Sequence, residues 1–143
     1  MDEDILGPID YLAIEFPDTH ISGGAFELLM QLVQRGIIEV LDLEFVAKSA
    51  DGTVRKVGLD SIEHDSDVDV TLWLAAESGL LDASDLTTVA ADMEPGKVAA
   101  IVVYENVWAV PLLTTVERGH ARIIGAARID AEDVIAALGD RPA

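Results

Sequence analysis

Apolar residues recur along the chain at two spacings, which predict alternating strands and helices. Residues 9–16 form an almost continuous apolar run that stops at Pro17, as a buried strand does. Apolar positions then return at helical spacing from Phe26 to Val33, and Gly36 fits the C-terminal end of that helix. The same pattern predicts further strands at 37–48, 53–57, 97–104 and 121–129, further helices at 70–77, 84–93, 108–118 and 130–139, and a hairpin turn at Asp51-Gly52.

This order of elements predicts a single α+β domain over residues 1–143. It reads as two split βαβ units, a ferredoxin-like sandwich in which a hairpin and a helical insert separate the units and an extra C-terminal helix follows. In that fold the strands 9–16 and 97–104 are central, and the strands 37–48 and 121–129 lie at the edges. Charge agrees with this order, because charged residues discourage aggregation at sheet edges and both predicted edge strands carry them: Glu39, Asp42, Glu44, Arg122 and Arg128.

Both faces of the first strand are apolar, with Tyr11 and Ala13 on one face and Leu12 and Ile14 on the other. A simple ferredoxin-like sheet has helices on one face only. The insert helices, the C-terminal helix or another subunit must therefore cover the second face. We expect a contact between copies of the chain to cover at least part of it, and so a homo-oligomer.

The charge of the chain is strongly negative and unevenly distributed. Among 143 residues, 27 are acidic and nine are basic, which gives a net charge of −18 and disfavours nucleic acid as a partner. Residues 60–94, the acidic helical insert, hold ten acidic residues and no basic one, whereas residues 97–129 are slightly basic. We expect the insert to face solvent, a basic partner or the basic edge of a neighbouring subunit. The last case predicts assembly that weakens as salt is added.

The ends and apolar stretches of the chain predict neither export nor membrane insertion. The N-terminus is acidic and lacks the basic and apolar regions of a signal peptide. The longest apolar stretch, 98–113, is interrupted by Glu105 and Asn106, and a spanning helix needs about 20 mostly apolar residues. We expect a cytoplasmic protein with no membrane contact.

The sequence offers no recognisable catalytic or metal-binding motif. Cysteine is absent and the three histidines are scattered, so we expect no enzyme, no cofactor and no metal site. Residues 65–69 open like a calcium loop, but Val70 stands where glycine is needed and Ala76 where a bidentate glutamate is needed. An enzyme remains an alternative only if acidic groups such as Asp10, Glu15 and Glu105 are buried.

Two short segments are candidate sites. Polar and aromatic residues at the end of the third main strand suit a ligand or interface contact; the alternative is that Asn106 turns the chain, Glu105 is exposed, and Tyr104 and Trp108 pack. The segment 22–24 precedes a helix, where backbone N–H groups can bind an anion; the alternative is a serine cap with glycines that allow a tight entry. The candidates are Glu15, Tyr104, Glu105, Asn106 and Trp108 for a ligand or interface, and Ser22, Gly23 and Gly24 for an anion.

Several segments together resemble a bacterial family known only as domain of unknown function 6325, and the likeness covers nearly the whole chain. They are Gly7-Pro8-Ile9-Asp10-Tyr11 through Glu15-Phe16-Pro17, Val40-Leu41-Asp42-Leu43 through Asp51-Gly52, Ser78-Gly79-Leu80-Leu81, Glu94-Pro95-Gly96, and Tyr104-Glu105-Asn106 with Trp108. The layout is also distantly similar to the stress-associated family of unknown function 1269. Members of that family often carry a glycine-rich apolar segment where this chain has the acidic residues 60–69. The resemblance implies a bacterial, cytoplasmic protein with a link to stress, and it implies no activity.

These observations favour a non-enzymatic, self-associating interaction protein. The alternative is a regulatory module that binds a small ligand, as other ferredoxin-like domains do.

Overall fold

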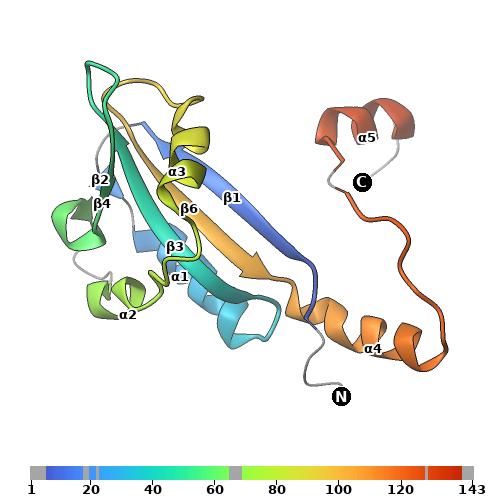
Figure 1. Cartoon of the computed structure of the whole chain (residues 1–143). Coiled ribbons are helices and arrows are strands. Elements are labelled where there is room, and N and C mark those ends of the chain that lie inside the picture. The colour runs from blue at the N-terminus through green and yellow to red at the C-terminus, as the bar shows by residue number, and fades with distance from the viewer. Residues whose placement is uncertain (1–5, 18–19, 22, 65–68, 128, 140–143) are drawn as a thin grey trace.

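The chain forms a four-stranded sheet with helices on both faces, and an arm then leads away from the sheet (Figure 1). This computed structural model describes residues 6–17, 20–21, 23–64, 69–127 and 129–139. In chain order the elements are β1 (Ile9–Phe16), β2 (His20–Ile21), α1 (Gly23–Gln34), β3 (Glu39–Lys48), β4 (Val54–Val57), the 3-10 turn η2 (Leu59–Ser61), β5 (Glu63–His64), α2 (Val70–Leu74), α3 (Ala83–Ala90), β6 (Val98–Glu105), the 3-10 turn η3 (Val107–Ala109), α4 (Val110–Arg118) and α5 (Ala131–Leu138).

The four-stranded sheet has the order β1-β6-β3-β4, and each pair of neighbours is antiparallel. β6 and β3 are therefore the central strands, and β1 and β4 lie at the edges. β2 and β5 form a separate two-stranded parallel sheet. The prediction of an α+β protein is confirmed, and so are the positions of its first three main strands along the sequence.

The first core lies between the sheet and the helices α1 and α2. Phe26 of α1 packs on Trp73 of α2, with ring centroids 5.4 Å apart, and on Phe45 of β3, with centroids 6.4 Å apart. Leu43 and Val102 complete the sheet side of this core. Aromatic pairs at these distances add to the stabilisation that burial alone provides.

The second core lies on the opposite face of the sheet, under α3. Leu86 and Ala90 of α3 pack against Val46 of β3 and Ile101 of β6. An insert helix thus covers the second face over the central strands, as one of the three predicted alternatives has it. The β1 side of that face remains uncovered, since Tyr11 and Ala13 are exposed.

Polar groups hold α3 in place at both ends. Asp82 and Asp85 form a capping box, in which each side chain accepts a backbone N–H of the other residue at 2.9 Å. At the other end, Lys48 Nζ donates to the carbonyls of Ala90 and Met93, both at 3.0 Å. A cation at the C-terminus of a helix interacts favourably with the helix dipole. Because Lys48 belongs to β3, the sheet helps to position α3.

Local signals in the sequence place the turns correctly. Gly52 has φ +90° in the predicted hairpin, a backbone conformation that side chains disfavour. Gly36 has φ +70° just after α1. Pro111 lies in the first turn of α4, the one part of a helix that tolerates proline.

Three predictions about the sheet are corrected. The strand predicted at 121–129 is absent: among the described residues of that range, none belongs to a strand. Without it β1 is an edge strand, although its apolar sequence predicts a central one. β3 is central although charge predicted an edge, because Asp42 and Glu44 find hydrogen-bond partners inside the fold and are both fully buried.

The arm, residues 110–139, contains α4, the segment 119–130 and α5, and Figure 1 shows it leading away from the sheet. No described residue of the arm is buried. Its large apolar side chains are nevertheless numerous, and the exposed ones are Leu112, Ile123, Ile124, Ile129, Val134, Ile135 and Leu138. Large exposed apolar patches on folded domains are commonly contact regions.

Among the described residues, no helix has the length and apolar character needed to cross a membrane.

Candidate functional site

The predicted site after the third main strand is a tight turn that connects β6 to the arm. Asn106 donates its backbone N–H to the Pro8 carbonyl at 2.8 Å, and its Nδ2 donates to the same carbonyl at 2.8 Å and to Asp10 Oδ2 at 3.0 Å. Trp108 Nε1 donates to Asn106 Oδ1 at 3.2 Å, and the Trp108 backbone N–H donates to the Ile37 carbonyl. All polar groups of the Asn106 side chain are thus used within the fold. We call residues 106–109 the hinge.

The structure corrects two details of the alternative stated for this turn. Glu105 is buried rather than exposed, and its Oε2 accepts the Gly7 N–H at 2.8 Å. Trp108 is 61% exposed rather than packed, whereas Tyr104 does pack at the margin of the first core. The side-chain hydrogen bonds of the turn hold the fold together, and its exposed aromatic ring is that of Trp108.

Gly7 allows this turn to close. A Cβ at Gly7 would lie 2.1 Å from the Asn106 carbonyl oxygen, which is far inside van der Waals contact. Gly7, just before β1, and Asn106, the first residue of the hinge, therefore touch backbone to backbone.

Glu15 lies at the opposite end of β1 and does not join the turn. In the register of β1 and β6, Ile9 is opposite Glu105, whereas Glu15 is opposite Ala99. Glu15 Oε1 accepts the Glu94 N–H at 2.7 Å, which ties β1 to the end of the insert. The predicted ligand or interface residues thus fall into two separate places.

The predicted anion site lies at the start of α1. Ser22 lies outside the described residues, Gly23 is buried and Gly24 is exposed. Anion binding there stays a prediction.

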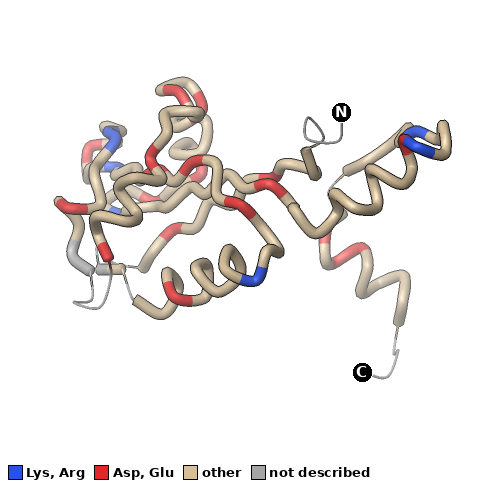
Figure 2. The backbone as a smooth tube through the Cα atoms, turned by 90° about the horizontal axis from the view of Figure 1, so that it is seen from below, with Lys and Arg blue, Asp and Glu red and all other residues tan. Residues whose placement is uncertain are grey.

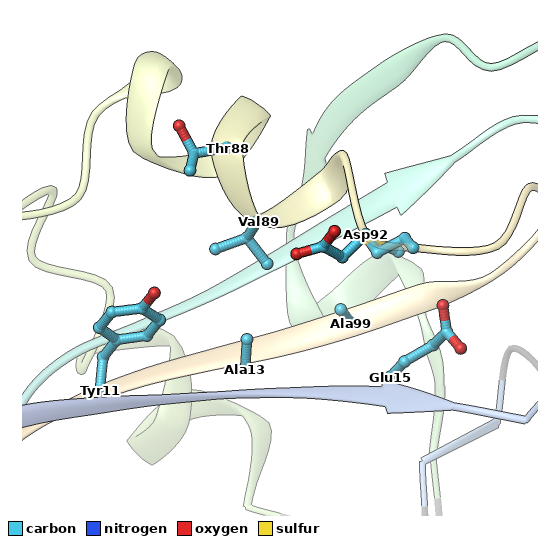
Figure 3. A pocket seen from close by; sticks show the side chains of 8 residues that line it. Tyr11, Ala13, Glu15, Thr88, Val89, Asp92 and Ala99 are labelled. Atoms are coloured by element: carbon cyan, nitrogen blue, oxygen red, sulfur yellow. The ribbon is translucent and has the colours of Figure 1, made fainter. Parts of the chain in front are cut away.

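Open grooves run along both sides of β1. The α3-side groove has a volume of about 290 Å³; Figure 3 shows Tyr11, Ala13 and Glu15 of β1 facing Thr88, Val89 and Asp92 of the insert across it. The α1-side groove, also about 290 Å³, has an almost wholly apolar lining. Its residues include Leu12, Ile14 and Phe16 of β1 and Ala25, Leu28 and Leu29 of α1.

A buried pair of acidic residues in β3 is the main feature that sequence reasoning missed. Asp42 accepts the backbone N–H groups of Ser78 and Leu81, each at 2.9 Å. Glu44 accepts the Gly79 N–H at 3.3 Å, and Lys56 Nζ lies 2.9 Å from its other oxygen. The signal was present as two acids of one strand two residues apart, which places them on one face, followed by a Ser-Gly turn at 78–79.

The two carboxyl groups titrate differently because their surroundings differ. Burial raises the pKa of Glu44, the hydrogen bond with Asp42 raises it further, and Lys56 opposes both, so that the pKa reaches about 7. Burial alone would raise the pKa of Asp42 too, but hydrogen bonds from Glu44, Leu81 and Ser78 outweigh it and lower that pKa. Below about pH 7 Glu44 is thus mostly protonated, whereas Asp42 carries the charge.

This acid pair anchors the loop 78–81 to the sheet. Ser78 Oγ also donates to the Leu41 carbonyl at 2.7 Å. The carboxylates therefore satisfy the backbone of a loop, a structural task, and the described residues contain no group of three or more His, Cys, Asp or Glu side chains placed to hold a metal ion.

The fold and its sites define an antiparallel α+β domain with an internal acid pair and an open sheet edge. A family model described as "Family of unknown function (DUF6325)" matches residues 5–141, so the chain belongs to that family. The comparisons do not show the distant similarity to family 1269. No curated protein and no solved structure matches the chain.

We predict that Gly7→Ala lowers the free energy of unfolding by about 1–3 kcal/mol, because the new methyl group meets the Asn106 carbonyl. Urea denaturation followed by circular dichroism measures this. Gly119→Ala is the matched control, since its Cβ would lie 3.5 Å from the nearest atom, and it should change stability by less than about 0.5 kcal/mol. Equal stability of Gly7→Ala and wild type would contradict the described closure.

Glu44 should make stability fall as pH rises. Its pKa is higher in the folded chain, about 7, than its ordinary value of 4.5, so the folded chain binds more protons between these values. The stabilisation is complete below about pH 4.5 and lost as pH rises through 7. In Glu44→Gln the amide cannot ionise, so this variant should gain about 1–3 kcal/mol relative to wild type between pH 5 and pH 8.

Urea denaturation at a series of pH values gives this difference. Glu39→Gln, exposed on the same strand, removes the same charge and serves as the control; its difference from wild type should stay constant. Parallel pH profiles for wild type and Glu44→Gln would show that Glu44 is not held protonated.

Proposed function

We propose that the protein is a non-enzymatic interaction protein that self-associates through β1. The observation that carries this proposal is the open edge of the sheet: among the described strands, only β6 pairs with β1, so one side of an eight-residue strand has no ladder partner. The four central residues of β1, from Tyr11 to Ile14, carry no charge. Natural sheets protect such edges with charge, proline or a covering element, or use them for pairing.

The side chains of β1 support the same proposal. Tyr11 is 55% exposed and Ile14 47% exposed, on opposite faces of the sheet, so apolar surface is open above and below the edge. The two grooves described above flank this strand. A docked strand would satisfy the edge and bury both faces at once.

The described buried carboxyl groups support a non-enzymatic role. Asp42, Glu44 and Glu105 each accept backbone N–H groups that the fold requires. A cytoplasmic location and a ferredoxin-like arrangement of the assembled sheet belong to the same proposal, and the sequence pattern is their support. A link to stress also belongs to it, and its support is the family resemblance alone.

Binding of a small ligand is the second candidate. The α3-side groove combines an apolar floor with Glu15, Thr88 and Asp92 at its rim, which is the composition of many ligand sites. A thermal-shift screen against nucleotides, amino acids and divalent ions tests it; a compound that raises Tm in wild type but not in Ala13→Trp, which fills the groove, would support it.

Self-association predicts a solution mass that is a multiple of 15.3 kDa. Ile14→Glu places a charge in the α1-side groove and should weaken association at least about tenfold, because an unpaired charge is then buried at the contact. Light scattering over a range of protein concentrations measures both.

Leu72→Glu is the matched control, since Leu72 is 44% exposed on α2, away from β1, and it should leave association unchanged. A wild-type mass of one chain at every concentration would contradict the proposal.

A further inference from the structure

The arm contains an exposed apolar segment that pairs with no described strand, and the outer edge of β1 has no partner strand among the described residues. Residues 121–127 follow α4 in the range where the sequence pattern predicts a strand, and Ile123 and Ile124 are 56% and 86% exposed. They belong to no strand, and among the described strands none pairs with the outer side of β1. An unpaired strand edge and an unpaired apolar segment in one chain are complementary.

α4 has apolar residues that match the apolar lining of the α1-side groove. α4 follows β6, and a right-handed crossover from β6 to a strand beside β1 would place it on the face that α1 covers. The groove beside α1 on that face is almost wholly apolar, and α4 carries Leu113 and Val116 three residues apart on one side.

The hinge prevents the arm from lying on β1 of its own chain. Asn106 is held to Pro8 and Asp10, Trp108 is held to the Ile37 carbonyl, and Ala109 is buried. These contacts direct α4 away from the sheet, as Figure 1 shows, and a return of the arm would break them. A second copy can accept the arm with the hinge unchanged.

Charge favours a second copy of this chain as the acceptor. Residues 1–109 hold 22 acidic and five basic residues, whereas residues 110–129 hold one acidic and three basic residues. Figure 2 shows Lys and Arg positions at the far end of α4, whereas Asp and Glu dominate the sheet and insert. Arg122 of the arm would approach an edge flanked by Glu15 and Asp92.

We infer that two copies exchange arms: residues 121–127 of each copy add a strand to the free edge of β1 in the other, and α4 fills its α1-side groove. This inference rests on the proposed function and specifies its partner and geometry. Each copy then has the strand that the sequence predicts beside β1, supplied by its neighbour. The assembled sheet has the ferredoxin-like order.

Disulfide trapping tests the exchange directly, because the chain has no cysteine of its own. Full-length Ala13→Cys, with its cysteine on β1, is mixed with full-length ¹⁵N-labelled Ile123→Cys or Ile124→Cys, refolded together and oxidised. Mass spectrometry should show mixed disulfide dimers about tenfold above those of either variant with itself, because contact raises the effective thiol concentration.

Leu72→Cys in place of Ala13→Cys is the control and should give no enrichment. If wild type self-associates but the mixed disulfide is not enriched, the exchange is wrong and the proposed function stands. If wild type is monomeric, both fail. A chain carrying both Ala13→Cys and Ile124→Cys that links mainly to itself would show that the arm closes on its own copy and overturn the inference.

A complementation experiment gives an independent readout. Ile14→Glu damages the acceptor edge and Ile124→Glu damages the arm, so each variant alone should be monomeric. Their mixture should recover dimers, because one of its two contacts pairs an intact edge with an intact arm. Pairing of β1 with β1 would instead leave Ile124→Glu fully dimeric, and recovery of no dimers from the mixture would also contradict exchange.

Discussion

The hydrogen bonds of Asn106 fix the direction in which the chain leaves the sheet, and the placement of all later residues depends on them. A side-chain amide that bonds both Pro8 and Asp10 joins the entrance of β1 to the exit of β6. Gly7 lets the two backbones approach closely enough for this. With these contacts α4 leads away from the sheet, so the edge of β1 and the apolar side chains of the arm both stay exposed.

The buried acid pair, Asp42 and Glu44, fixes a second connection, on the face of the sheet that α3 covers. Asp42 and Glu44 lie in a central strand, where two neighbouring charges would be destabilising, and the raised pKa of Glu44 keeps that carboxyl group mostly neutral below about pH 7. Their oxygens accept the backbone of the loop 78–81, which leads into α3. The covering of the second face therefore depends on polar groups inside the sheet.

Hydrophobic periodicity was sufficient to place most elements, because the apolar spacing that indicates a strand or a helix lies within the element's own residues. Gly36, Gly52 and Pro111 marked turns and a helix start for reasons contained in single residues. Strand order was not predictable in the same way. The apolar sequence of β1 indicates a central strand although β1 lies at an edge of the described sheet, and the acids in β3 look like edge charges until partners such as Ser78, 36 residues from Asp42, are known. The spatial grouping of the candidate site residues was not predictable either, since Glu15 and Glu105 belong to one strand pair but lie at opposite ends of it.

The most direct test is an isotope-filtered nuclear Overhauser experiment on the full chain, with ¹³C,¹⁵N-labelled and unlabelled copies refolded together. Exchange predicts cross-peaks between copies that connect Ile123 or Ile124 with β1 residues such as Leu12 and Ala13, and with no other strand. Cross-peaks that connect these residues only within one copy, or connect β1 with β1 between copies, would contradict it.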